Sequence, residues 1–258
     1  MTSIRHIGLV GYGNVGSHLG RILGQSGDIR LTICQRSQQS PPPTLPNATF
    51  SRNLEDLSGT DLIIIAINDD AIVPVVDNLR NNISGNPVVC HTAGSVTSKV
   101  MEPWFKRYGV LYPLQTFSSE KELDYSTIPV FITGSDPETT NHIKEIAHLI
   151  SPIIHEINDN QRMSLHIAAV FTCNYTNALY SIGHRICTDH DLEFKYLLPL
   201  IEETARKIGE LSPIEAQTGP AIRGDWATVH KHENFLADYE PDIHDLYHQL
   251  AEYIIQNK

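Results

Sequence analysis

The run Gly-Tyr-Gly-Asn-Val-Gly at residues 11–16 restricts the fold of this chain more than any other feature. It follows an apolar strand pattern at residues 4–10 and precedes a helical pattern at residues 15–25. In that context the first glycine permits a tight turn, the second leaves room for a pyrophosphate, and the third lets the helix pack against the strand. The helix N-terminus adds unpaired N–H groups and the positive end of its dipole. A glycine-rich turn without a ligand is the alternative, but we expect a dinucleotide to bind at Gly11, Tyr12, Gly13, Asn14, Val15 and Gly16.

The first 157 residues alternate between strand and helix patterns, which indicates a doubly wound parallel sheet. The aliphatic run at residues 61–67 is typical of a parallel strand that is covered on both faces. The polar, proline-rich segment at residues 37–46 indicates a loop. We expect strands at residues 4–10, 31–34, 61–67, 87–91, 110–114, 128–133 and 153–157, and helices at residues 15–25, 71–81, 96–108 and 138–150.

After Asn158 the pattern becomes helical. Asn158 and Gln161 resemble a capping box that opens a long helix to about Cys187. Further helices are expected at residues 192–208, bent or broken at Pro199, and at residues 242–256, with a loop at residues 218–224. We therefore predict an α/β fold in which a Rossmann domain at residues 1–157 precedes a smaller all-helical domain at residues 158–258. Because the long helix carries more small and apolar residues than such a domain can bury, we expect the second domain to form a homodimer and to contribute to the substrate site.

The end of the second strand pattern indicates which dinucleotide binds. Enzymes that use NAD usually place Asp or Glu there to bind the ribose hydroxyls, whereas this chain reads Cys34-Gln35-Arg36-Ser37. Arg36 can form charge-assisted hydrogen bonds with a 2′-phosphate, and Ser37 adds a hydroxyl donor. We therefore predict NADP(H) rather than NAD(H) as the cofactor, with Arg36 and Ser37 binding the phosphate. The alternative is that Arg36 is a solvated loop residue.

Polar segments follow three further strand patterns, and parallel strands place such segments at the edge of the sheet where ligands bind. The segments are Asn68-Asp69-Asp70, His91-Thr92-Ala93-Gly94-Ser95 and Tyr112-Pro113-Leu114-Gln115-Thr116-Phe117. The alternative for residues 92–95 is a turn that caps a helix. We expect the cofactor to contact Asn68, Thr92, Ala93 and Gly94, catalysis to involve His91, and the substrate to contact Ser95 and Gln115.

Composition excludes several classes of partner. A formal net charge of −11 argues against binding of nucleic acid, which requires a basic surface. The apolar runs are far shorter than the roughly 20 residues of a membrane helix, so we expect no membrane partner. The four cysteines are not at metal-ligand spacing, and we interpret them as reduced thiols of a cytoplasmic protein.

Segments from both halves carry a resemblance to one family. They are residues 11–16, 91–95 and 113–117 in the first half, and residues 166–171, Asn174 and residues 218–225 (Thr-Gly-Pro-Ala-Ile-Arg-Gly-Asp) in the second. Over nearly its full length the chain resembles Rossmann-like proteins related to deazaflavin-dependent NADP oxidoreductases, which carry an all-helical second domain of poorly defined function. More distantly, its layout is similar to 6-phosphogluconate, 3-hydroxyisobutyrate and ketopantoate dehydrogenases or reductases.

The long helix of the second half holds the expected catalytic groups. The more distant enzymes place a Lys and an Asn on this helix to polarise the substrate oxygen; here His166 and Asn174 stand in roughly that region and Lys is absent. At about 100° per residue, His166 and Asn177 point within about 20° of each other, and Asn174 lies about 80° from His166. We expect His166 and Asn174 to be catalytic and Asn177 to bind substrate. The alternative is a core histidine with two amides that bond to neighbouring helices.

Two other groups of polar residues are candidate sites. Arg223 lies in the Gly/Pro-rich loop, where it is expected to bind an anionic substrate; it could equally form an ion pair with Asp225. The pairs His230/His232 and His244/His248 have spacings that a metal could use, but Asp245 stands where a zinc protease helix needs Glu, and we expect no metal site.

The sequence therefore predicts an NADP-dependent oxidoreductase that transfers a hydride between NADP(H) and a carbonyl or imine carbon of a small polar substrate. The alternative is a non-catalytic sensor that binds NADP(H). A third and weaker reading is a metal-dependent hydrolase that uses the histidines.

Overall fold

The computed structural model describes residues 4–35 and 45–257. The chain divides into two compact units, residues 1–173 and residues 174–258. The predicted domain boundary after residue 157 stays a prediction, because the helical stretch that begins at Asp159 continues across the division between the units.

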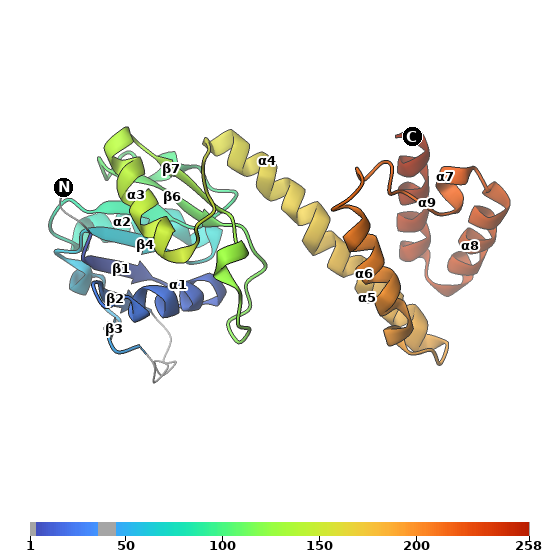
Figure 1. Cartoon of the computed structure of the whole chain (residues 1–258), viewed down its shortest axis with the longest axis horizontal. Coiled ribbons are helices and arrows are strands. Elements are labelled where there is room, and N and C mark those ends of the chain that lie inside the picture. Colours follow the sequence, from blue (N-terminus) through green and yellow to red (C-terminus); the bar gives the residue numbers. More distant parts are fainter. Residues whose placement is uncertain (1–3, 36–44, 258) are drawn as a thin grey trace. The chain divides into compact units, whose positions relative to one another are not determined.

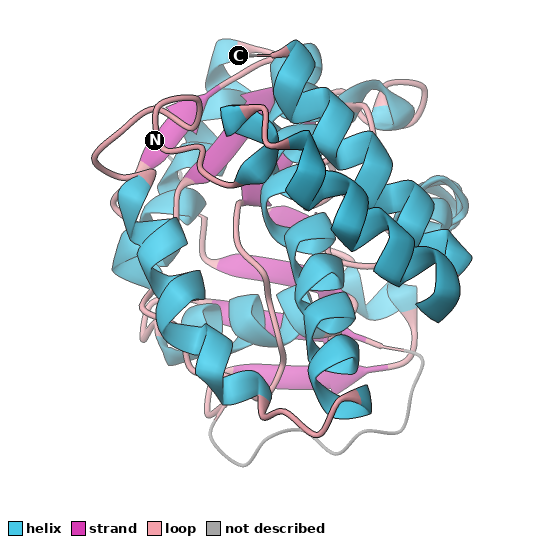
Figure 2. Ribbon diagram, turned by 90° about the vertical axis from the view of Figure 1, so that its right-hand side faces the viewer, coloured by secondary structure: helices cyan, strands magenta, loops and turns pink. Residues whose placement is uncertain are grey.

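The first unit is built on one mixed sheet with helices on both of its faces (Figures 1 and 2). Its described strands follow the order β3-β2-β1-β4-β5-β6-β7-β8. This order is that of a doubly wound Rossmann-type sheet, so the predicted fold class is confirmed. The strand bounds are β1 His6–Val10, β2 Arg30–Cys34, β3 Ala48–Ser51, β4 Leu62–Ile65, β5 Val88–His91, β6 Tyr108–Pro113, β7 Val130–Gly134 and β8 Ile154–Glu156.

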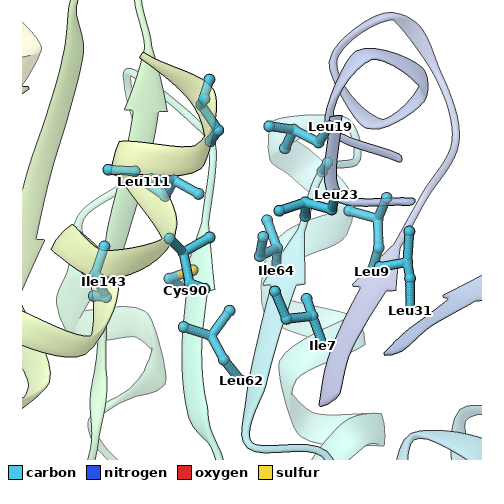
Figure 3. Packing of buried hydrophobic residues seen from close by; sticks show 14 of the residues in the cluster. Ile7, Leu9, Leu19, Leu23, Leu31, Leu62, Ile64, Cys90, Leu111 and Ile143 are labelled. Atoms are coloured by element: carbon cyan, nitrogen blue, oxygen red, sulfur yellow. The ribbon is translucent and has the colours of Figure 1, made fainter. Parts of the chain in front are cut away.

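Successive residues of the central strands face two separate hydrophobic layers, as expected of a sheet that is covered on both sides. In β4, Leu62 and Ile64 pack beneath helices α1 (Asn14–Gln25) and α3 (Pro137–Ile150), as Figure 3 shows for this layer. Ile63 and Ile65 point to the other face, toward α2 (Ile72–Asn82). The aliphatic run that was read as a buried parallel strand therefore belongs to the centre of the sheet.

One pair of strands departs from the predicted parallel arrangement. β7 runs antiparallel to β6, and β8 is parallel to β7. A parallel pair needs a long crossover, usually a helix; residues 114–129 between β6 and β7 contain only the short 3-10 turn η4 (Tyr125–Thr127). The strands approach closely at Gly109, where a Cβ would lie 2.0 Å from the carbonyl oxygen of Thr133.

Two local predictions in the first unit are wrong. Residues 96–108 do not form the expected helix: the structure has only the 3-10 turn η3 (Ser98–Met101), and Pro103 lacks the N–H that a continuing helix would need. Met101 and Phe105 are nevertheless buried, so the spacing of apolar residues indicated which side chains are buried but not a helix. The short edge strand β3 was not predicted, because its four residues carry little alternation.

Helices form the described remainder of the chain. The expected capping box is confirmed: the Gln161 backbone N–H donates to the Asn158 side chain, and the Gln161 side chain accepts from the Asn158 N–H. The helix bounds are α4 Asp159–Ala169, α5 Thr176–Asp189, α6 Leu198–Lys207, α7 Pro220–Arg223, α8 Trp226–Tyr239 and α9 Pro241–Gln256.

The predicted long helix is interrupted by a π-helical segment, η5 (Val170–Tyr175). The Thr172 hydroxyl donates to the Ala168 carbonyl at 3.0 Å, a local bond that competes with regular helix geometry. A π-helix does not keep 100° per residue. The angle of about 20° between His166 and Asn177 holds only for an uninterrupted α-helix and does not apply across the π-helical segment.

The second unit also differs in detail from the prediction. Residues 220–223 form one helical turn inside the expected loop, and α8 was not predicted at all. The bend expected at Pro199 is a helix start, since η6 (Phe194–Leu197) precedes α6 and Pro199 stands in its first turn, where a missing N–H does no harm. Asp225, the N-cap of α8, accepts hydrogen bonds from the Thr228 N–H and hydroxyl.

Candidate dinucleotide-binding site

The turn between β1 and α1 requires glycine at two positions for reasons that the structure makes explicit. Gly11 has φ +96°, in the left-handed region, and a Cβ there would lie 2.3 Å from the Ala66 carbonyl oxygen. A Cβ at Gly16 would lie 2.3 Å from the Gly11 carbonyl oxygen. These contacts bring α1 close to the sheet, as expected for the first and third glycines of a dinucleotide-binding turn.

The second glycine and the start of α1 fit a bound pyrophosphate. A Cβ at Gly13 would have no atom within 4 Å, so no packing contact of the described residues requires glycine there. Gly13 is also the N-cap, so no side chain caps the first turn, and that turn has no acidic residue. Its N–H groups and the helix dipole therefore favour an anion at this position.

A cavity of about 720 Å³ opens above this turn, at the carboxyl ends of the strands. Ligands of open α/β sheets bind at this edge. Another cavity, of about 440 Å³, lies at the start of β2 and β3, which is the opposite edge, and we do not associate it with the cofactor. Seven residues predicted as cofactor contacts line the larger cavity: Gly11, Tyr12, Gly13, Asn14, Val15, Asn68 and Thr92.

Tyr12 lines the cavity although its ring is used in packing, and the other predicted cofactor residues lie elsewhere. The Tyr12 ring packs edge-on against Phe50 and next to Gly20, so its side chain is engaged in packing. Ala93 and Gly94 are buried and are not among the residues that line the cavity. Arg36 and Ser37, which carried the prediction of NADP(H), lie outside the described residues.

His91 ends β5 and is fully buried. Its Nδ1 accepts from the Ala93 N–H at 3.2 Å, and its Nε2 lies 3.4 Å from the Thr97 carbonyl oxygen. Burial, with a smaller contribution from the nearby Arg162 charge, lowers the pKa of His91 to about 4. Both ring nitrogens therefore contact the backbone of the following loop, which favours a role in shaping that loop over the proton transfer predicted for it.

The predicted substrate residues of the first unit are engaged locally. The Ser95 hydroxyl donates to the Asp69 carboxylate, which joins the loops after β5 and β4. The exposed Gln115 side chain accepts from the Thr116 N–H at 2.8 Å, within its own segment. Ser95 thus lies beside the other polar groups of this edge, whereas no described contact links Gln115 to them.

His166 lies against the carboxyl end of the sheet, on α4. The Tyr112 hydroxyl, near the end of β6, is 3.0 Å from His166 Nδ1. A Cβ at Gly94 would lie 2.5 Å from the same nitrogen, so Gly94 makes room for the imidazole. Gly94 was predicted to contact the cofactor, and this second role could not be read from the sequence. His166 thus packs against Gly94, which follows the cavity-lining Thr92 by two positions in the chain.

A charged pair, formed by the buried Arg162 and the half-buried Asp159, attaches the start of α4 to the loop after β5. The Asp159 carboxylate accepts from the Arg162 guanidinium at 2.6 Å and the Thr97 hydroxyl at 2.5 Å, and from the Ser98 N–H and hydroxyl at 3.0 Å each. Arg162 is 1% exposed and also donates to the Val96 carbonyl. Burial alone would raise the pKa of Asp159, but these hydrogen bonds lower it. His166 follows Arg162 by one helical turn on the same face of α4, so this attachment positions its ring.

Three predicted residues, Asn174, Asn177 and Arg223, belong to the second unit, and all are exposed. Asp225 is used as a helix cap; the charge of Arg223 contributes to lowering the pKa of Asp225, but no ion pair joins the two side chains in the described part of the chain. The roles expected of these three residues stay predictions.

Sequence reasoning missed Tyr112, Asp69 and the Asp159–Arg162 pair, and also Arg52, which lines the larger cavity. Tyr112 and Asp69 stood in segments that were singled out, but only the fold shows which of their side chains meet. Arg162 could have been noticed from its spacing to Asp159, although such pairs are usually solvated. Arg52 follows the unpredicted β3.

No described helix is long and apolar enough to cross a bilayer. Across residues 4–35 and 45–257, no group of three or more His, Cys, Asp or Glu side chains could hold a metal ion.

Comparisons with known proteins agree with this architecture. A family described as a domain of unknown function, DUF2520, matches residues 128–254, which include the last strands of the sheet as well as the helices. A protein from Bacteroides fragilis, provisionally named an NADP oxidoreductase, is 36% identical, covers 98% of each chain and has a TM-score of 0.89. No curated protein matches. The chain therefore belongs to the family of Rossmann-type proteins with the NAD(P)-binding oxidoreductase fold and a DUF2520 C-terminal domain, and the resemblance inferred from sequence is confirmed.

Two more distant structures are similar in fold. A protein from Thermotoga maritima is 21% identical over 97% of each chain, with a TM-score of 0.70. An imine reductase variant from Myxococcus stipitatus is 13% identical, covers 99% of this chain and 95% of its own, and has a TM-score of 0.71. At these identities the likeness concerns the fold alone.

His91 gives a prediction about pH. Because its pKa is lowered from 6.5 to about 4, the unfolded chain binds this proton more readily than the folded chain. The free energy of unfolding is therefore highest above about pH 6.5 and decreases as the pH falls toward 4, by about 2 kcal/mol between pH 7.5 and pH 5. Urea unfolding at both pH values should show that His91→Asn removes much of this dependence, whereas His148→Asn, on the exposed face of α3, does not. An NMR titration of His91 with a midpoint at 6 or above would contradict the prediction.

Proposed function

We propose that this protein is an NADP(H)-dependent oxidoreductase that transfers a hydride between the cofactor and a carbonyl or imine carbon of a small polar substrate. The observation that carries the proposal is the pairing of a glycine turn fit for pyrophosphate with an imidazole at the same edge of the sheet. Membership of a family whose B. fragilis member is provisionally named an NADP oxidoreductase supports it.

The chain's own contribution to cofactor binding is the α1 N-terminus and the residues that line the cavity. Unpaired N–H groups of the first turn would hold the pyrophosphate, and Asn68 and Thr92, at the ends of β4 and β5, would border the nicotinamide side. When bound, NADPH supplies the hydride and the protein orients it toward the acceptor carbon.

His166 would supply the proton that the reduced acceptor needs. As hydride reaches carbon, the electron pair of the C=O or C=N bond moves to oxygen or nitrogen, and a donor must stand within roughly 3 Å of that atom. Burial raises the pKa of the Tyr112 hydroxyl, so it stays protonated near neutral pH. In the protonated ring, Nδ1 donates to the Tyr112 hydroxyl oxygen, and Nε2, which has no hydrogen-bond partner among the described residues, can donate its proton to the substrate and leave a neutral imidazole.

The alternative is a non-catalytic NADP(H) sensor. The helix that carries a Lys in the more distant dehydrogenases has none here, and the Tyr112–His166 bond would also serve a purely structural role. Turnover separates the two functions, because both bind the cofactor.

We also propose that the protein is a homodimer formed through its helical half. No residue of α5 or α6 is buried, although α6 alone carries Leu198 and Leu200 at 45% and 64% exposure. Apolar surface of this extent on a helical unit usually marks an interface.

The first prediction concerns the cofactor. Because Arg36 and Ser37 replace the acidic residue of NAD enzymes, calorimetric titration should give tighter binding of NADPH than of NADH, and Arg36→Asp should reverse the preference. Equal affinities, or a preference for NADH, would show that this part of the proposal is wrong.

The second prediction concerns His166. His166→Ala should bind NADPH with unchanged affinity but reduce turnover by about 10²- to 10⁴-fold, the usual contribution of a general acid. The assay is NADPH oxidation with a panel of small carbonyl and imine compounds, and exposed His148→Ala on α3 is the control. If the wild type binds NADPH and oxidises it with none of these compounds, the result favours the sensor.

The third prediction concerns assembly. Light scattering should give twice the chain mass at micromolar concentration, and Leu200→Asp should shift the equilibrium toward monomer because a carboxylate is costly to bury. A wild-type monomer under these conditions would refute the homodimer.

A further inference from the structure

Arg52 lies at the carboxyl edge of the sheet, next to the strand end that decides dinucleotide preference. β2 and β3 are parallel, and Cys34 pairs with Ser51 in their register. The next residues along the two strands are Gln35 and Arg52, and the Gln35 N–H donates to the Ser51 carbonyl at 3.0 Å. The unpredicted strand β3 therefore places Arg52 beside the position at which NAD enzymes carry an acid.

The same cavity contains this arginine and the phosphate-binding turn. Its lining passes from Cys34, Gln35, Arg52 and Leu54 on the β2–β3 side, through residues 10–15, to Asn68 and Thr92 on the β4–β5 side. In a Rossmann sheet the end of the second strand faces the adenosine ribose. Arg52 therefore stands on the adenosine side of the cavity, away from the end assigned to the nicotinamide.

Arg52 is the only charged side chain among the described residues that line this cavity. Its side chain is exposed and forms no hydrogen bond or ion pair within the described residues. Two carboxylates lie nearby on η1 (Leu54–Leu57): Asp56 accepts from the Ser51 hydroxyl, and Glu55 is exposed. Neither forms an ion pair with Arg52, so the guanidinium is available to an anion.

We propose that Arg52 binds the 2′-phosphate of NADP(H) and is a determinant of the preference for NADP(H) over NAD(H). The planar guanidinium can donate two parallel hydrogen bonds to phosphate oxygens, and Gln35 introduces no negative charge that would repel them. This inference rests on the proposed NADP(H)-dependent function.

The experiment compares the affinities of NADPH, NADH, 2′,5′-ADP and 5′-AMP for the full-length wild type and three variants by calorimetry. Arg52→Ala should lower the affinity for NADPH and 2′,5′-ADP by about 10- to 100-fold, which is the effect of one lost charge-assisted contact. The affinities for NADH and 5′-AMP should change by no more than about twofold. Arg52→Lys should fall between, because it keeps the charge but not the paired donors. Arg30→Ala, at the opposite edge on β2, is the matched control and should change none of the affinities.

The outcomes separate this inference from the proposed function. Loss of NADPH and NADH affinity to the same extent would mean that Arg52 contacts the adenine or the pyrophosphate, and would overturn the inference. A wild type that prefers NADPH, with an unchanged preference in Arg52→Ala, would overturn the role of Arg52 alone. A wild type that binds neither dinucleotide would refute the proposed function itself.

Discussion

The close approach of β1, β4 and α1 at Gly11 is the constraint on which the rest of the site depends. Gly11 adopts a left-handed conformation, and a Cβ on it would lie 2.3 Å from the Ala66 carbonyl oxygen. Gly16 in turn packs against the Gly11 carbonyl oxygen. No side chain separates helix from sheet at this point, so the α1 N-terminus opens directly on the cavity. The uncapped N–H groups and the free space at Gly13 then make the cavity suited to phosphate.

A second attachment holds α4 at the same edge. Burying a charged pair usually costs more in desolvation than the attraction returns, unless hydrogen bonds satisfy both partners. Asp159 meets that condition through Thr97, Ser98 and Arg162; Arg162 uses its two terminal nitrogens, toward Asp159 and the Val96 carbonyl, while its buried Nε has no hydrogen-bond partner among the described residues. The geometry of these bonds allows one placement of the helix start, which brings His166 against Gly94 and Tyr112. Polar bonding of this kind specifies a position that apolar contact alone would leave loose.

Much of the fold was predictable because its signals are local. The glycine turn, the aliphatic run of β4 and the capping box at Asn158 each lie within a few consecutive residues. The predicted helix at residues 96–108 was wrong because Met101 and Phe105 are buried by distant strands and α2, and burial produces an apolar pattern whether or not a helix forms. β3 was missed because its place at the sheet edge comes from pairing with β2, which four residues do not encode.

The sequence by itself determined the class of the fold, the phosphate-binding turn and the absence of an acid after the second strand, because each depends on residues adjacent in the chain. Tertiary structure alone decided which side chains meet: Tyr112 with His166, Ser95 with Asp69, and Arg52 with the cavity that starts at Gly11. The reason is physical. Parallel strands bring their carboxyl ends to one edge, so residues separated by tens of positions become neighbours, and only the packed sheet defines their distances.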